Sequence, residues 1–73
     1  MDLFDIEDAR RMSREEAAAR LRSLADALAR NNSVEFSRAG RLITVQVPDQ
    51  VHLKIEVELG DDGENELEVE LTW

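Results

Sequence analysis

Two segments, VHLKIEVEL at residues 51–59 and ELEVELTW at residues 66–73, alternate apolar and polar side chains along their whole length. Because successive side chains of a strand point to opposite faces, this alternation predicts two half-buried β-strands. The turn-rich residues GDDGEN at 60–65 lie between the two segments and predict a hairpin. We expect the rest of the chain to cover the apolar face of this hairpin.

The composition of the 73-residue chain allows one domain, residues 1–73, with a modest core. Its hydrophobic content of 42% is too high for a disordered chain. It contains no Cys, which excludes a disulfide framework, a thiolate nucleophile and a Cys-ligated zinc site. The acidic start, MDLFD, lacks the features of a signal peptide, and no apolar run reaches membrane-spanning length. We therefore expect a cytoplasmic protein.

The net charge of −8 is carried by one half of the chain. Residues 1–41 hold eight Arg and eight acidic residues, which cancel, whereas residues 42–73 hold Lys54 and nine acidic residues. Phosphate neutralisation by Lys and Arg supplies most non-specific affinity for nucleic acid, so the acidic half disfavours nucleic-acid binding. It disfavours anionic membranes for a similar reason. A basic protein partner fits this charge better.

The best-marked boundary in the sequence is SREE at residues 13–16, which matches a capping box. The Ser13 hydroxyl is expected to accept a hydrogen bond from the Glu16 N–H, and strong helix formers then predict a helix over residues 14–30. Its apolar stripe consists of Ala17, Leu21, Leu24 and Leu28. Two i,i+4 ion pairs are expected on its surface: Glu16 with Arg20, and Asp26 with Arg30. Asn31 and Asn32 are expected to end the helix in the left-handed conformation.

Three further strands are predicted, over residues 3–7, 34–36 and 42–47. Gly40 is expected to have a positive φ in the turn between the last two, and Pro48 ends the third. The elements therefore run β-α-β-β-β-β. This is an α+β class, in which one amphipathic helix packs on one face of a largely antiparallel sheet. The four later strands are expected to form a meander. The first strand pairs either with the last strand or with residues 34–36.

The inward-facing side chains of these elements form the predicted core. They are Phe4, Ile6, Leu21, Leu24, Leu28, Val34, Phe36, Ile43, Val45, Val47, Leu53, Ile55, Val57, Leu67, Val69, Leu71 and Trp73. Trp73 shares the inward phase of its strand, so we expect it to close the core. Because Trp is enriched at interface hot spots, Trp73 is also a candidate interaction residue.

In the order of these elements, the chain resembles the amphi-Trp domain family of small prokaryotic proteins and domains. The matching features are SREEAA at residues 13–18, the stretch from Leu21 to Leu28, VPD at 47–49, residues 51–58 and the closing ELEVELTW at 66–73. The resemblance covers nearly the whole chain and implies a single intact domain. It implies no catalytic residues.

No pattern in the sequence predicts catalysis or metal binding. His52 is the sole histidine and falls on the polar side of its strand, so we expect an exposed structural residue. The loop GDDGEN at residues 60–65 is rich in oxygen ligands but lacks the spacing of a calcium loop, and we expect an acidic hairpin turn. We therefore expect no enzyme activity, no cofactor and no metal site.

The unusual surface feature is a set of glutamates that share the polar face of the predicted hairpin. These candidate interaction residues are Glu56, Glu58, Glu66, Glu68 and Glu70. Like charges opposite one another destabilise a sheet, and Lys54 neutralises at most one of them. Three interpretations remain open. The face is solvated with counterions, as in a salt-rich cytoplasm; it docks a basic surface of a partner or of another copy; or it mimics nucleic-acid phosphates.

Three arginines, Arg10, Arg11 and Arg14, gather before and at the start of the helix, where cations oppose the helix dipole. They either pair locally with acidic neighbours or receive carboxylates from another subunit. The small core, the available strand edges and the unlike charge of the two halves lead to one functional hypothesis: a non-enzymatic interaction or assembly module that forms a homo-oligomer, with a dimer as the simplest case. The alternative is an acidic decoy or regulator that binds a basic, nucleic-acid-binding protein through the glutamate-lined face.

Overall fold

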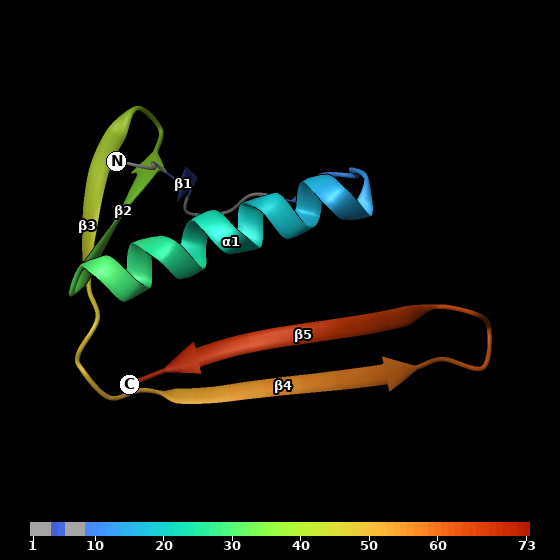
Figure 1. Ribbon diagram of the computed structural model, residues 1–73. Helices are drawn as coiled ribbons and strands as arrows, with labels where there is room; N and C mark the ends of the chain where they lie inside the picture. The colour runs from blue at the N-terminus through green and yellow to red at the C-terminus, as the bar shows by residue number, and fades with distance from the viewer. Residues whose placement is uncertain (1–3, 6–8) are drawn as a thin grey trace.

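The computed structural model describes residues 4–5 and 9–73 of the chain. Its elements are β1 (Phe4–Asp5), α1 (Arg14–Arg30), β2 (Ser33–Arg38), β3 (Arg41–Gln46), β4 (His52–Leu59) and β5 (Asn65–Thr72), as Figure 1 shows. The α+β class, with one helix followed by four strands, is confirmed. Of the first predicted strand, residues 4 and 5 are described as β1, and the remainder of 3–7 lies outside the described residues.

Helix α1 begins where the capping box predicts. The Glu16 N–H donates a 3.1 Å hydrogen bond to Ser13 Oγ, and Glu15 and Glu16 occupy the first turn, where the helix dipole favours acids. The two expected ion pairs are present: Arg20–Glu16 at 3.7 Å and Arg30–Asp26 at 3.9 Å. The end of the helix differs from the expectation, because Asn31 is extended (φ −132°) rather than left-handed, which leads the chain directly into β2.

Strands β1, β2 and β3 form one sheet, in that order. β1 runs parallel to β2, with Phe4 beside Phe36, and their ring centroids are 6.0 Å apart. Of the two positions left open for the first strand, the structure has the one beside residues 34–36. β2 and β3 are antiparallel, joined by a two-residue turn in which both Ala39 (φ 50°) and Gly40 (φ 77°) are left-handed.

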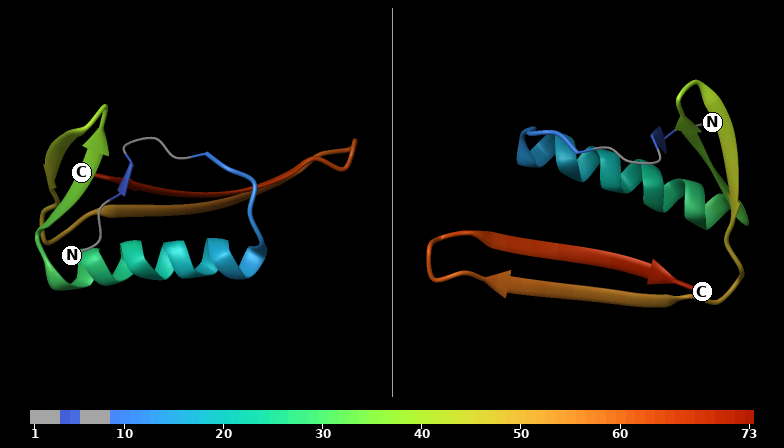
Figure 2. Two further views of the ribbon diagram at one scale, coloured as in Figure 1. Left: turned by 90° about the horizontal axis from the view of Figure 1, so that it is seen from above. Right: turned by 180° about the vertical axis from the view of Figure 1, so that it is seen from behind.

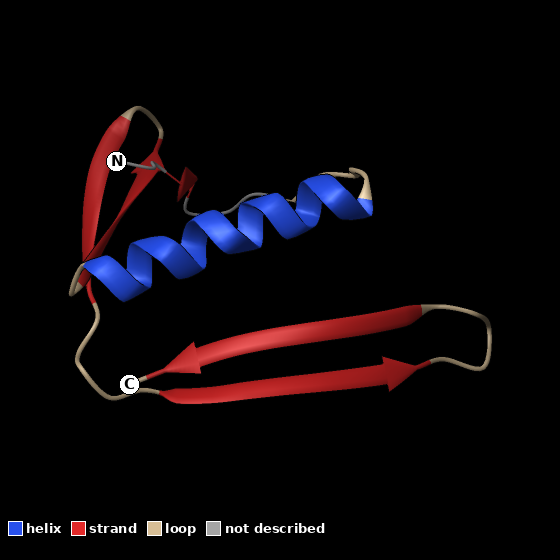
Figure 3. Cartoon of the chain, viewed as in Figure 1, coloured by secondary structure: helices blue, strands red, loops and turns tan. Residues whose placement is uncertain are grey.

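Strands β4 and β5 form a second, separate two-stranded sheet, so the expectation of one continuous meander is wrong. The two groups of strands are plain in Figure 3. The break lies in residues 47–51. The Val47 N–H donates to Asn32 O at 2.8 Å, and Pro48 has no N–H to extend a ladder. The chain therefore leaves the first sheet at Val47 and begins a new ladder at His52.

Among the described residues, Val34 is the one buried hydrophobic side chain, at 3% exposure. Other predicted core residues are half-buried: Phe4, Leu24, Leu28, Phe36, Ile43, Val45, Val47 and Leu71. The remaining ones are exposed, contrary to prediction: Leu21, Leu53, Ile55, Val57, Leu67, Val69 and Trp73. Ile6 lies outside the described residues. The core expected from the sequence is thus incomplete within one chain.

These predicted core side chains are exposed because the helix does not lie over the sheet that carries most of them. α1 packs against β2, but no Cα of α1 lies within 8 Å of a Cα of β4 or β5, all of which are fully described. In Figure 1 α1 is drawn above β5 and no labelled element overlaps the hairpin, and in the view from above in Figure 2 the helix is again set off from the two strands. The view from above in Figure 2 shows β4 and β5 nearly superposed, so their sheet stands edge-on to that view. Both faces of the hairpin are therefore open.

The β2–β3 turn provides a test of the fold. Ala39 has a left-handed backbone, which costs an alanine roughly 1 kcal/mol and suits asparagine much better. We expect Ala39→Asn to raise the free energy of unfolding by about 0.5–1 kcal/mol, measured by urea denaturation. The matched control is Ala29→Asn, at an exposed position of α1, where the poorer helix propensity of Asn should lower stability instead. Destabilisation by Ala39→Asn would contradict the turn geometry.

Candidate functional site

The β4–β5 hairpin sorts its side chains into two chemically different faces. Antiparallel pairing places Leu53 opposite Leu71, Ile55 opposite Val69 and Val57 opposite Leu67. Val51 and Trp73 continue this face at the open end of the hairpin, and Leu59 and Asn65 close it at the turn. We call this set the apolar face: Val51, Leu53, Ile55, Val57, Leu59, Leu67, Val69, Leu71 and Trp73.

Apart from Leu71, which is half-buried, every side chain of the apolar face is exposed. The exposed fraction is 63% for Ile55 and 52% for Val69, at the centre of the face, and 77% for Leu59 at the turn end. A contiguous exposed apolar row of this kind marks an interaction surface in a soluble protein. An isolated two-stranded hairpin is also only marginally stable in water unless its apolar face is covered. The described chain therefore leaves this face without cover.

The opposite face carries the predicted glutamates. Glu56 lies directly opposite Glu68, and Glu58 opposite Glu66, while Lys54 pairs across the strands with Glu70. The structure thus brings together the five acidic residues that the sequence grouped, and we call Glu56, Glu58, Glu66, Glu68 and Glu70 the carboxylate ladder. Lys54 Nζ lies 2.8 Å from Glu56 Oε2 and offsets part of the repulsion.

The crowding of carboxylates changes the pKa of Glu66. A hydrogen bond between the Glu66 and Glu68 side chains raises the pKa of Glu66, and repulsion from Glu68 and Glu58 raises it further. The pKa of Lys54 is also raised, first by its hydrogen bond to Glu56 and then by attraction to Glu70 and Glu68. In both cases neighbouring glutamates act first as hydrogen-bond partners and then as charges.

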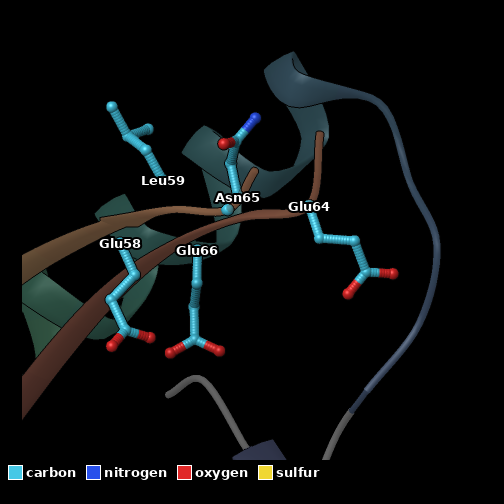
Figure 4. Close-up of a pocket in the computed structure, with 6 residues that line it drawn as sticks. Glu58, Leu59, Glu64, Asn65 and Glu66 are labelled. Atoms are coloured by element: carbon cyan, nitrogen blue, oxygen red, sulfur yellow. The ribbon is translucent and has the colours of Figure 1, made fainter. Parts of the chain in front are cut away.

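The turn between the strands is held by its own backbone. Gly60 N–H donates to Glu64 O at 2.8 Å, and a Cβ at Gly60 would come within 2.5 Å of that oxygen. Asp62 Oδ1 accepts from the Glu64 N–H at 3.1 Å. Figure 4 shows Glu58 and Glu66 projecting to one side beside this turn, with Leu59 and Asn65 on the other side and Glu64 pointing away from both pairs. A shallow depression there is lined by Glu58, Leu59, Gly60, Glu64, Asn65 and Glu66.

The other candidate residues lie elsewhere. Arg10 and Arg11 are exposed before α1, and Arg14 at its start lies 3.9 Å from Glu15. Figure 1 places the start of α1 and the residue 60–65 turn toward the same end of the molecule. His52 is exposed opposite Thr72, on the polar side as expected.

Trp73 is 61% exposed, so the prediction that it closes the core is wrong. The reason is that its strand belongs to a sheet that no other element of the described chain covers. Trp73 lies instead beside a depression that it lines together with Asn32, Gln46, Val47, Pro48 and Asp49. The exposure of the apolar face was the functional feature that the sequence reasoning missed. The signal for it was the proline and polar run PDQ at residues 48–50, which separates the two sheets.

In the described part of the chain, no group of three or more His, Cys, Asp or Glu side chains is arranged to hold a metal ion. The described helix is too short and too polar to cross a membrane.

The carboxylate ladder makes stability depend on pH. A glutamate whose pKa is raised in the folded state destabilises the fold above that pKa, and this cost disappears as the pH falls through it. We expect Glu66→Gln to raise the melting temperature by a few degrees at neutral pH, and this gain to vanish on titration to about pH 4. Thermal melts by circular dichroism at fixed protein concentration measure both values.

The control for this titration is Glu64→Gln, which removes the same formal charge from a side chain that points away from Glu58 and Glu66 (Figure 4). It should change the melting temperature much less at every pH. An equal gain from Glu64→Gln and Glu66→Gln would show that total charge, rather than the ladder, sets the effect.

Comparison with known proteins gives one finding. The family model described as the Amphi-Trp domain matches residues 2–73, which include all the elements above. Neither the curated proteins nor the solved structures gave a match. The match agrees with the resemblance seen in the helix start, in VPD at residues 47–49 and in the closing ELEVELTW. The chain therefore belongs to the Amphi-Trp domain family.

Proposed function

We propose that this protein is a non-enzymatic assembly module that self-associates through the apolar face of the β4–β5 hairpin. One observation carries the proposal: the apolar face is exposed on a hairpin that the rest of the described chain does not cover. The sole histidine is exposed and no catalytic group accompanies it, which supports a role in binding rather than catalysis. The absence of Cys means that no oxidising compartment is needed, and we propose the cytoplasm.

A second copy of the chain is the partner that best fits the uncovered apolar face. The Cα radius of gyration is 14.1 Å, against about 11 Å for a compact chain of this length, so a single chain is extended for its size. The missing cover is a requirement of the fold itself, and a second copy is present wherever the chain is made. Each copy offers the same uncovered face, which is the condition for a two-fold symmetric dimer. Covering it would complete the core that one chain leaves open.

The ladder then faces outward on each side of the dimer. This arrangement keeps the acidic residues in water, where their repulsion is screened by salt. Because each chain carries a net charge of −8, dimers held by apolar contacts should tighten as salt rises. Docking of Arg10, Arg11 and Arg14 on the ladder of another copy would instead weaken with salt. The salt dependence of the solution mass separates these two modes of self-association.

An acidic decoy for a basic protein is the second candidate. It is supported by the like-charged pairs Glu56–Glu68 and Glu58–Glu66, which leave uncompensated negative charge on an exposed face. Retention of an Arg-rich peptide at low salt and its release at high salt would support it, with the variant Glu58→Gln/Glu66→Gln as the test of the face. Equal retention by that variant would contradict it.

The leading proposal is tested by one substitution on each face. We expect Ile55→Lys to convert a dimer into a monomer, measured by light scattering after size exclusion. Each dimer would lose two buried Ile side chains at about 1.5 kcal/mol or more each, so the dissociation constant should rise roughly 100-fold or more. Ile55 is 63% exposed in the single chain and lies outside the β1–β3 sheet, so circular dichroism should show that the monomeric variant retains the signal of α1, even where its uncovered hairpin opens.

The matched control is Glu56→Lys, which introduces the same side chain one residue away on the opposite face. It should leave the dimer intact. A monomeric wild-type protein at high concentration and high salt, or equal loss of dimer in both variants, would overturn self-association through the apolar face.

A further inference from the structure

The apolar face is close to symmetric about its centre. Ile55 and Val69 form the middle pair, and a leucine-containing apolar pair flanks it on each side. These flanking pairs are Leu53 with Leu71 and Val57 with Leu67. A face with this order presents a similar surface when it is turned end for end, so two copies can pack with their strands running in the same direction or reversed. The choice between the same and the reversed strand direction rests on the proposed function, because it presupposes a dimer through the apolar face.

Charge favours the reversed arrangement. The turn of each hairpin carries Asp61, Asp62 and Glu64, all exposed. Packing in the same direction would place two such turns side by side, about 10 Å apart across the layers. Reversal separates them by the length of an eight-residue strand, about 27 Å, which is well beyond the screening length of roughly 8 Å at physiological salt. The acidic turns of the two copies then repel each other little.

The shape of the two ends also favours reversal. The open end of the apolar face carries the largest side chain of the chain, Trp73, which is 61% exposed. The turn end carries Leu59, 77% exposed, beside Asn65, whose side chain Nδ2 donates to Gly63 O at 3.3 Å. Figure 4 shows Leu59 and Asn65 projecting on the side opposite Glu58 and Glu66. Facing pairs of large and small residues fill an interface better than large on large.

We propose that two copies pack their hairpins face to face with the strands reversed. Ile55 and Val69 then lie around the two-fold axis, and Trp73 of each copy packs over the turn end of the other, against Asn65 and Leu59. The partner is a second copy of this chain, and Trp73 is the anchor at each end of the interface.

Distances between spin labels test this directly, because the chain has no Cys of its own. A nitroxide on Asp61→Cys marks the turn end, and one on Asp49→Cys marks the open end, near Trp73. In the reversed dimer, pulsed electron–electron double resonance should give a separation of about 27 Å or more between the two position-61 labels. A mixture of chains labelled at 61 and at 49 should give a much shorter distance between the two positions.

The outcomes separate this inference from the proposed function. A short 61-to-61 distance in a dimer, or a long 61-to-49 distance in the mixed sample, overturns the reversed arrangement and leaves self-association standing. If the unlabelled wild-type protein is a monomer, the proposed function itself is overturned. Light scattering on each labelled variant shows that the label has not changed the mass.

A double-mutant cycle gives a second readout that needs no label. Leu59 and Trp73 stand at opposite ends of one hairpin and do not touch within a chain. If they also do not touch between copies, Leu59→Ala and Trp73→Ala should act independently, and their effects on the dissociation constant should multiply. In the reversed dimer the two side chains touch between copies. The double variant should then raise the dissociation constant several-fold less than the product of the two single changes. A purely multiplicative result overturns the Trp73–Leu59 contact.

Discussion

A two-stranded hairpin cannot bury its own apolar face, and the organisation of this protein follows from that constraint. Backbone pairing between β4 and β5 satisfies their inner hydrogen bonds but turns the apolar face to one side, where no described element of the chain lies over it. The three-stranded sheet uses α1 as its cover and buries Val34 there. The hairpin has no such element. In the proposed dimer a second copy would supply this cover.

Local signals in the sequence predicted the local structure well. The Ser13 cap, the extent of α1, the positive φ of Gly40 and the grouping of the ladder were all confirmed, because each depends on residues close in sequence or on strand periodicity. The position of β1 was left open and required the structure. The continuous meander was wrong because pairing of β3 with β4 depends on the path of residues 47–51, which periodicity does not report.

The same limit explains the failure at Trp73. Alternation shows which side chains share a face, but it does not show whether anything lies on that face. Trp73 belongs to the apolar side of β5, as predicted, and yet it is 61% exposed, because the sheet that carries it stands apart from α1. A pattern that normally indicates a core thus marks an exposed face here. Sequence patterns of this kind define faces, while the tertiary arrangement decides their use.

The charges on the hairpin limit how far assembly can proceed. The outer edges of β4 and β5 offer unpaired backbone groups, which in an apolar strand would template fibres. Here the alternate side chains are largely glutamates, so a third strand added at either edge would bring further carboxylates alongside Glu58 or Glu68. The ladder thus disfavours association through the strand edges, which agrees with the proposed use of the apolar face.

The five-residue turn between β4 and β5 has a consequence for the rate of folding. Strands β4 and β5 are adjacent in sequence, so their turn can close within microseconds of the start of refolding. A hairpin that lacks cover opens again quickly, and in the proposed dimer it would be retained when it meets a second one. The last step of folding would then be a bimolecular collision rather than a rearrangement within one chain. For this protein the speed of reaching the native state would be set by how many copies are present.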